Sequence, residues 1–184
     1  LYDPRSGARL PVLERADAHG PPDRVLIPGV TVRRGQAGLL PAPQRRLAVN
    51  AGGEAYLLGY DLGGQTTAGG TLGVTLYWRA LRQIRDDYTV FVHLMDGEGA
   101  RLAQDDAQPN WDGPVPTTDW QPGEVVKDVH RLRLPQPLGR PPYHLWVGWY
   151  WWETGERLLA VRAGDLEVRD HAEWPVDIGS AARD

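Results

Sequence analysis

A run of aromatic residues between positions 143 and 152 offers the clearest candidate chemistry in this 184-residue sequence. If the run forms a strand, its side chains alternate between two faces, and one face carries Trp146, Tyr150 and Trp152. A solvated strand would ordinarily carry polar residues there. Flat aromatic rings can hold the apolar C–H faces of sugars while nearby polar groups bind the hydroxyls. The pattern suggests a glycan-binding platform, and coverage of these rings by a loop or a neighbouring domain is the competing, slightly favoured interpretation.

Two further tryptophans, Trp111 and Trp120, lie in a segment rich in proline and glycine between residues 109 and 123. Loops on a rigid β-scaffold often carry binding residues, so both tryptophans are candidate ligand contacts. A tryptophan in a proline-rich loop can also pin that loop onto the core, and this structural role is the favoured interpretation. With the three aromatic residues of the strand, they complete the set of candidate ligand-binding residues.

The acidic residues form no recognisable metal-binding motif. Five aspartates could in principle supply oxygen ligands to calcium, namely Asp105, Asp106, Asp112, Asp119 and Asp128. Their spacing matches no EF-hand loop, so solvated or turn-capping roles are favoured, and we predict neither a metal site nor a cofactor. Asp128 differs from the others because it shares the inward parity of Val126 and Leu132. A buried acid needs a partner, such as an arginine or a loop amide, so we expect a structural role.

The sequence also lacks the motifs of common catalytic sites. Its histidines do not show the HxH or HExxH spacing of zinc sites, and no nucleophile elbow or phosphate-binding loop occurs. A glycosidase needs two carboxylates across a cleft, and the sequence singles out no such pair. We therefore predict no catalytic residue, and a small glycoside-acting enzyme is the least favoured functional hypothesis.

The composition is that of a globular protein. Hydrophobic residues make up 41% and charged residues 24% of the chain, close to ordinary values. The 20 basic and 24 acidic residues are mixed along the sequence, and no basic stripe of the kind that binds nucleic acid is apparent. Cysteine is absent, so disulfides and thiolate chemistry are excluded. No run of about 18 apolar residues occurs, so we expect no membrane insertion by this segment.

Short alternating segments bounded by glycine, proline and aspartate predict an all-β fold. The clearest strand covers residues 71–80, where Leu72, Val74 and Leu76 share one face with Trp78 and Ala80. The other predicted strands span residues 45–49, 54–62, 87–95, 101–103, 124–134, 142–152, 157–161 and 165–169. About eight to ten strands of this length are typical of a two-sheet antiparallel β-sandwich with a jelly-roll-like arrangement.

An internal similarity suggests how the chain is divided. Residues 2–10 match residues 150–158 at Tyr, Ser/Thr, Gly, Arg and Leu with identical spacing, although turn chemistry alone could produce this match. The sequence begins at Leu1 without a leader, so we expect a segment of a larger protein. The predicted parts are a closing hairpin of a preceding similar domain or an N-terminal extension (1–36), a linker (37–43), the β-sandwich (44–170) and a loosely ordered tail (171–184).

Several segments together resemble a known kind of domain. They lie at residues 57–61, 71–79, 87–94, 104–109, 116–124, 128, 143–150 and 154–158. These residues resemble the β-sandwich domains that follow the membrane-spanning part of multi-pass bacterial proteins, notably in Chloroflexi-type bacteria. Many of those proteins look like dolichyl-phosphate-mannose-type glycosyltransferases. The resemblance covers about residues 45–169 and implies a jelly-roll-like fold in an extracytoplasmic, membrane-tethered setting. It assigns no catalytic residue.

The leading hypothesis is therefore a non-catalytic, extracytoplasmic accessory domain of a membrane-anchored glycan-handling protein. Its expected partners are a glycan and the membrane region of its own parent protein, with no nucleic acid. The alternative is a purely structural or protein-interaction β-sandwich without a small-molecule ligand. The sequence does not decide between them.

Overall fold

The computed structural model describes residues 42–163 and 167–179. The chain divides into two units, Leu1–Ala37 and Gly38–Asp184, and all the described residues belong to the second. The hairpin predicted at residues 1–36 and most of the predicted linker therefore lie outside the described residues.

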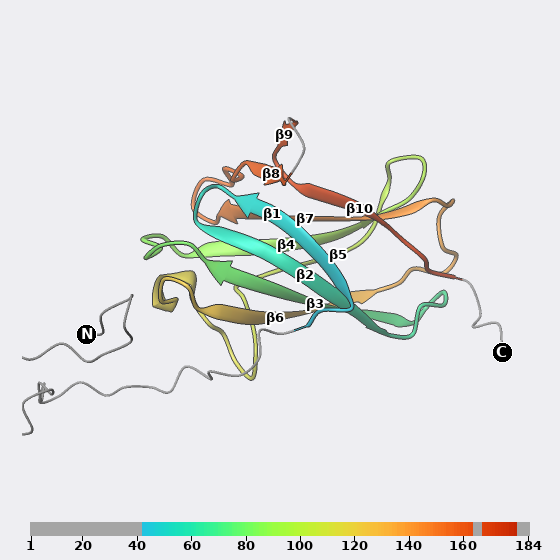
Figure 1. Cartoon of the computed structure of the whole chain (residues 1–184). Coiled ribbons are helices and arrows are strands. Elements are labelled where there is room, and N and C mark those ends of the chain that lie inside the picture. The colour runs from blue at the N-terminus through green and yellow to red at the C-terminus, as the bar shows by residue number, and fades with distance from the viewer. Residues whose placement is uncertain (1–41, 164–166, 180–184) are drawn as a thin grey trace, which may run out of the picture. The chain divides into compact units, whose positions relative to one another are not determined.

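The described residues form two antiparallel sheets (Figure 1). One sheet has the strand order β6-β3-β2-β1-β8-β9, and the other has the order β10-β7-β4-β5. The strands are β1 (Arg45–Ala51), β2 (Ala55–Gly64), β3 (Thr71–Ala80), β4 (Tyr88–Met95), β5 (Arg101–Ala107), β6 (Val125–Arg133), β7 (Tyr143–Trp151), β8 (Ala160–Arg162), β9 (Val168–Arg169) and β10 (Ala172–Val176). The prediction of an all-β, two-sheet antiparallel sandwich is confirmed.

The core lies between the sheets and follows the alternation of the sequence. On β3, Leu72, Val74 and Leu76 are fully buried and face the second sheet. Trp149 on β7 lies at the centre, where its ring contacts Trp78 edge-on at a centroid distance of 5.1 Å. Such aromatic contacts contribute roughly 0.5–1.5 kcal/mol beyond the burial of their area.

The edge of β6 is covered rather than free. The Val129 amide donates to the Asn110 carbonyl at 2.9 Å, and the Arg131 amide donates to Asp105 Oδ2 at 2.8 Å. These bonds occupy amides that would otherwise template pairing with another chain. They also fix the loop between β5 and β6 against the six-stranded sheet.

Residues 172–178 of the tail predicted to begin at residue 171 are instead part of the sandwich. Strand β10 pairs with β7, and Trp174, Val176 and Ile178 are all buried. The Trp174 ring stacks on Tyr60 of the opposite sheet at 4.8 Å. The prediction was wrong because a single tryptophan within a short polar segment gives too little alternation to reveal a strand.

Helical structure is minimal in the described residues. It consists of the short 3-10 turn η1 (Thr117–Asp119), which lies in the loop before β6. The described part of the chain holds no helix with the length and apolar character needed to cross a membrane.

Candidate functional site

Trp120 is a core residue. Its side chain has no exposed surface, and its ring contacts Trp149 at 5.4 Å with an interplanar angle of 82°. Its indole N–H donates to the Val115 carbonyl at 3.1 Å. In this arrangement Trp120 pins the loop onto the sandwich and is not available to a ligand.

Trp146 and Tyr150 lie on the outer face of the four-stranded sheet, where the alternation places them. Both are half-buried, and the covering groups come from the chain itself. The Trp146 ring stacks on His171 with centroids 4.1 Å apart. The Tyr150 ring lies beside Phe91, a neighbour on β4, at 6.4 Å. These two rings therefore do not form an open platform in the described structure.

An arginine closes the centre of the same face. The Arg157 guanidinium lies 4.3 Å from the centroid of Phe91 and donates to Asp170 at 2.8 Å. Phe91 is fully buried beneath it, and Phe91 in turn occupies the space above Gly148. The connection after β7 and the segment before β10 thus return over this sheet.

Trp152 is the exposed aromatic residue on this side, with 63% of its surface accessible. It comes directly after the end of β7, in the turn that leads toward β8.

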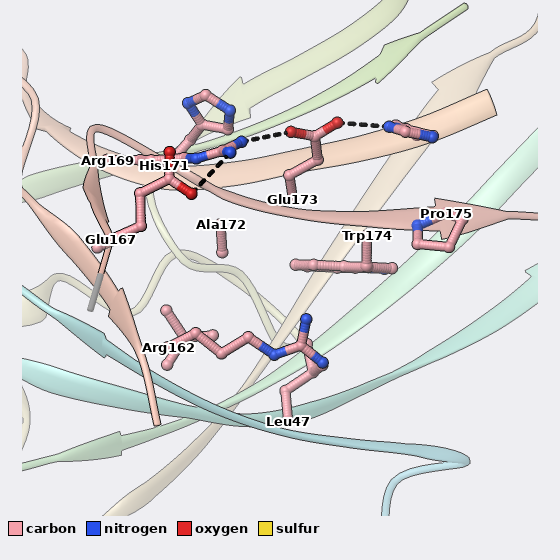
Figure 2. Close-up of a pocket in the computed structure, with 12 residues that line it drawn as sticks. Leu47, Arg162, Glu167, Arg169, His171, Ala172, Glu173, Trp174 and Pro175 are labelled. Carbon is pink, nitrogen blue, oxygen red and sulfur yellow. Dashed lines mark hydrogen bonds and ion pairs between the residues drawn. The ribbon is translucent and has the colours of Figure 1, made fainter. Parts of the chain in front are cut away.

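A small pocket lies at the open edge between β10 and strands β1 and β8. Its volume is about 280 Å³, and Trp174 and Leu47 form part of its apolar surface. Figure 2 shows the ion pairs along one wall, where Arg169 joins Glu167 and Glu173 at 2.9 Å each. Glu173 also contacts His144. Burial raises the pKa of Glu173, but the His144 hydrogen bond and the Arg169 charge outweigh it and hold that pKa below its usual value. The acidic groups of this wall are thus neutralised by the chain's own cations.

Trp111 lies on the other side of the molecule, at the outer face of the six-stranded sheet. Its ring is 46% exposed and lies under Lys127, whose Nζ is 3.6 Å from the ring centroid. Lys127 points outward from β6 because Val126 and Asp128 point inward. The bond between the Val129 amide and the Asn110 carbonyl anchors the residue next to Trp111. The sequence placed Trp111 only in a loop, and the structure places it under Lys127, one outward position along β6 from Val129, which lines a groove.

The groove runs over the outer face of β2, β3 and β6. Its volume is about 530 Å³, and Leu62 and Val129 contribute to its apolar surface. At its floor Gly63 pairs with Gly73, so the sheet carries no side chain on either strand at this level. A Cβ built at Gly63 would meet nothing within 4 Å, which shows that the space above it is open. The bare backbone lets a ligand approach the sheet closely.

A fixed carboxylate lines one side of the groove. The Tyr77 hydroxyl donates to Asp61 Oδ2 at 2.6 Å, and the Gln44 amide donates to Asp61 Oδ1 at 2.6 Å. Burial, together with the hydrogen bond to Asp61, raises the pKa of Tyr77 to about 12, so the phenol stays a donor. Thr75, which pairs with Asp61 on the neighbouring strand, supplies a hydroxyl, and Arg131 on β6 supplies a guanidinium. These groups can hydrogen-bond the hydroxyls of a sugar.

A buried cluster behind β6 holds the loop that carries Trp111. Asp128 is fully buried and accepts the Asn110 amide at 3.0 Å, which confirms the predicted loop-amide partner. Its other oxygen meets His130 Nε2 at 2.9 Å and accepts the Trp78 indole N–H at 3.3 Å. His130 Nδ1 in turn lies 3.5 Å from Asp105 Oδ2. A histidine, rather than the suggested arginine, therefore balances the charge.

The protonation of this cluster follows from its two carboxylates. Burial lowers the pKa of His130, but the hydrogen bonds and charges of Asp105 and Asp128 outweigh burial and raise it to about 9. The His130 hydrogen bond lowers the pKa of Asp105, against the opposing effect of burial. Because His130 is only 1% exposed, no external substrate reaches it. The cluster is suited to holding strands and loop together, not to proton transfer with a ligand.

The aspartates considered as calcium ligands do not converge. Asp105 and Asp128 face the interior, whereas Asp106 contacts His93 Nε2 at 3.0 Å on the outer face of the other sheet. Across residues 42–163 and 167–179, no group of three or more His, Cys, Asp or Glu side chains is placed to hold a metal ion.

Sequence reasoning missed the groove itself. Alternation along β6 could have shown that Lys127, Arg131 and Arg133 all point outward, opposite the buried Asp128 and His130. The pairing of Gly63 with Gly73 was not visible because register between strands depends on a bulge in β2 between Leu57 and Gly59.

Comparison with known proteins assigns no family. No protein-family model matches the chain, and no curated protein sequence matches it either. Among solved structures, the C-terminal domain of Wzt is similar with a TM-score of 0.48 at 12% sequence identity. That match covers 74% of this chain and 82% of that one. Similarity this distant assigns no ligand.

Proposed function

We propose that this chain is a non-catalytic accessory domain that binds a glycan in the groove over β2, β3 and β6. The observation that carries the proposal is the open floor at Gly63 and Gly73, bordered by the fixed Asp61 carboxylate. The exposed Trp111 ring lies under Lys127, one outward position of β6 away from Val129 of the groove lining. A flat floor, an aromatic edge and anchored polar groups match the alternating apolar faces and hydroxyls of sugars.

The wider setting follows the resemblance seen in the sequence. The domain would serve an extracytoplasmic, membrane-anchored, glycan-handling protein and present the groove to a polysaccharide. Catalysis would belong to other parts of such a protein. Hydrolysis of a chromogenic glycoside panel by this domain would contradict the non-catalytic assignment.

The test is binding to a glycan array, followed by titration calorimetry with the best ligand. Trp111→Ala is expected to weaken binding about ten-fold through the lost stacking contact. Gly63→Val should weaken it further, because the side chain fills the floor without meeting a neighbour. Trp152→Ala is the matched control, since this exposed tryptophan lies outside the groove. Its affinity should equal that of the parent.

Two results would contradict this assignment. A loss of binding in Trp152→Ala but not in Trp111→Ala would move the site to the four-stranded sheet. Failure of the parent domain to bind any glycan would favour the alternative, a structural or protein-interaction module. The covering of Trp146 and Tyr150 by the chain's own residues supports that alternative, because it removes one binding face.

A further inference from the structure

The outer face of β6 carries a row of positive charges along the groove. Lys127, Arg131 and Arg133 occupy alternate outward positions, and Arg131 lines the groove itself. Arg131 lies opposite Gly73 of the floor, and Arg133 lies opposite Thr71. Lys127 and Arg133 are six residue steps apart along the strand, which corresponds to about 20 Å, so the row is longer than a single sugar.

Among residues 42–163 and 167–179, none of the three cations forms a salt bridge. The charge of Arg131 does contribute to the lowered pKa of Asp105, whose carboxylate accepts the Arg131 amide. The acid that lines the groove is Asp61, which already accepts hydrogen bonds from Tyr77 and Gln44. The lining of the groove itself holds one arginine, Arg131, and one carboxylate, Asp61, while Lys127 and Arg133 extend the row of cations along β6 beyond it.

From this charge pattern we infer that the groove recognises an acidic glycan, a polymer whose sugars carry carboxylate, phosphate or sulfate groups. The inference rests on the proposed function and names the ligand class of the same site. The guanidinium fork of an arginine matches the geometry of these anions, with two parallel hydrogen bonds. The row then binds charges spaced along the polymer, and the glycine floor and Asp61 contact the uncharged rings and hydroxyls between them.

Asp61 also favours a glycan over a nucleic acid. A nucleic acid carries a phosphate at every residue, and binding sites for single strands combine cations with several stacking rings. The lining of this groove offers no aromatic ring among the described residues and includes a carboxylate, Asp61, while the exposed Trp111 ring lies farther along β6 under Lys127. Anions spaced several sugars apart avoid Asp61, whereas a continuous phosphate backbone meets it.

The test compares ligands of equal length but different charge by titration calorimetry. The probes are neutral dextran, polygalacturonate for carboxylates, a phosphorylated mannan for phosphates, dextran sulfate for sulfates, and a single-stranded DNA. We expect acidic polymers to bind at least about ten-fold more tightly than dextran at about 0.02 M salt. This preference should shrink at about 0.2 M salt, because exposed charges are screened. The tightest of the three acidic probes identifies the anion.

Substitutions of single arginines test whether the groove provides the preference for acidic polymers. Arg131→Gln and Arg133→Gln should each weaken binding of the preferred acidic polymer about two- to five-fold, as expected for exposed ion pairs. Arg140→Gln is the control, because it removes the same charge from an exposed arginine that pairs with Glu98 away from the groove. It should leave the affinity unchanged. All three side chains are exposed, so thermal denaturation should show unaltered folding.

Each remaining outcome overturns the inference in a distinct way. Equal binding of dextran and acidic polymers would overturn the charge preference and leave the proposed function standing. Absence of binding to any polymer would overturn both. DNA binding as tight as that of the acidic glycans would show a general polyanion surface. Equal losses in Arg140→Gln and Arg131→Gln would show that net charge, and not the groove, controls the affinity.

Discussion

The two outer faces of this sandwich are built from the same strand alternation but have opposite characters. The outer face of the four-stranded sheet carries aromatic residues such as Trp146, and Arg157 and His171 return over it. The outer face of the six-stranded sheet also carries aromatic residues, among them Tyr77, but its glycines leave the groove open. Aromatic content alone thus does not show which face is accessible. What separates the faces is where the connecting segments lie.

Each sheet also has a histidine paired with an aspartate. Asp128 and His130 lie behind the open face, and His93 and the partly exposed Asp106 lie on the closed face. Asp128 and His130 are buried to within 1% of full coverage, whereas Asp106 has a quarter of its side chain exposed. Removing one partner of a buried pair leaves an uncompensated charge. This difference gives the largest expected effect.

Asp128→Ala should lower the free energy of unfolding by about 3–5 kcal/mol, because it leaves the His130 charge buried and the Asn110 amide without its acceptor. Asp106→Ala, the matched change on the closed face, should cost about 1 kcal/mol or less. Urea denaturation measures both. Equal losses of unfolding free energy in the two variants would show that both pairs stabilise the fold to the same extent, which would contradict the difference between the two faces.

The two histidines should also give opposite pH dependence. The pKa of His130 is raised to about 9, so its stabilisation is complete below the unfolded value near 6.5 and is lost as the pH rises toward 9. Burial lowers the pKa of His93 despite the opposing Asp106 charge, so its contribution is lost as the pH falls below about 6.5. The loss at alkaline pH should be on the order of 3 kcal/mol.

Stability curves against pH for His130→Gln and His93→Gln provide the measurement. The first variant should be less stable at neutral pH and should lack the decline between about pH 6.5 and pH 9. The second should lack part of the decline on the acid side. An unchanged alkaline slope in His130→Gln would show that another group is responsible.

Added methyl groups at two glycines should give the smallest effects and should show directly which face is closed. In Gly148→Ala the new Cβ would lie 2.6 Å from Phe91 and 3.1 Å from the Asp170 carbonyl, so we expect a loss of about 1–3 kcal/mol. Gly63→Ala meets nothing and should be neutral or stabilising by up to about 1 kcal/mol. Thermal unfolding of the two variants makes the comparison. A loss at Gly63 as large as that at Gly148 would mean that the groove is filled in solution.

Most of the fold could be predicted because burial on one face imposes a period of two on each strand. The strand predicted at residues 71–80 matches β3, and Asp128 points inward as its parity required. The candidate site was predicted less well. Trp111 is exposed beside the groove, but Trp120 has the same kind of sequence surroundings and is fully buried. Local sequence cannot separate them, because the difference lies in the distant Trp149 that Trp120 contacts.

The sequence by itself determined that this is an all-β sandwich, and on clearly alternating strands such as β3 and β6 it determined which side chains point in or out, because these properties depend on neighbours along the chain. Only the tertiary structure decided which outer face is accessible. That outcome depends on contacts between distant residues, such as Arg157 over Phe91 and Gly63 beside Gly73. Register and the return paths of connecting segments carry no local pattern, so the groove beside the outward cations of β6 forms only when the sheets assemble.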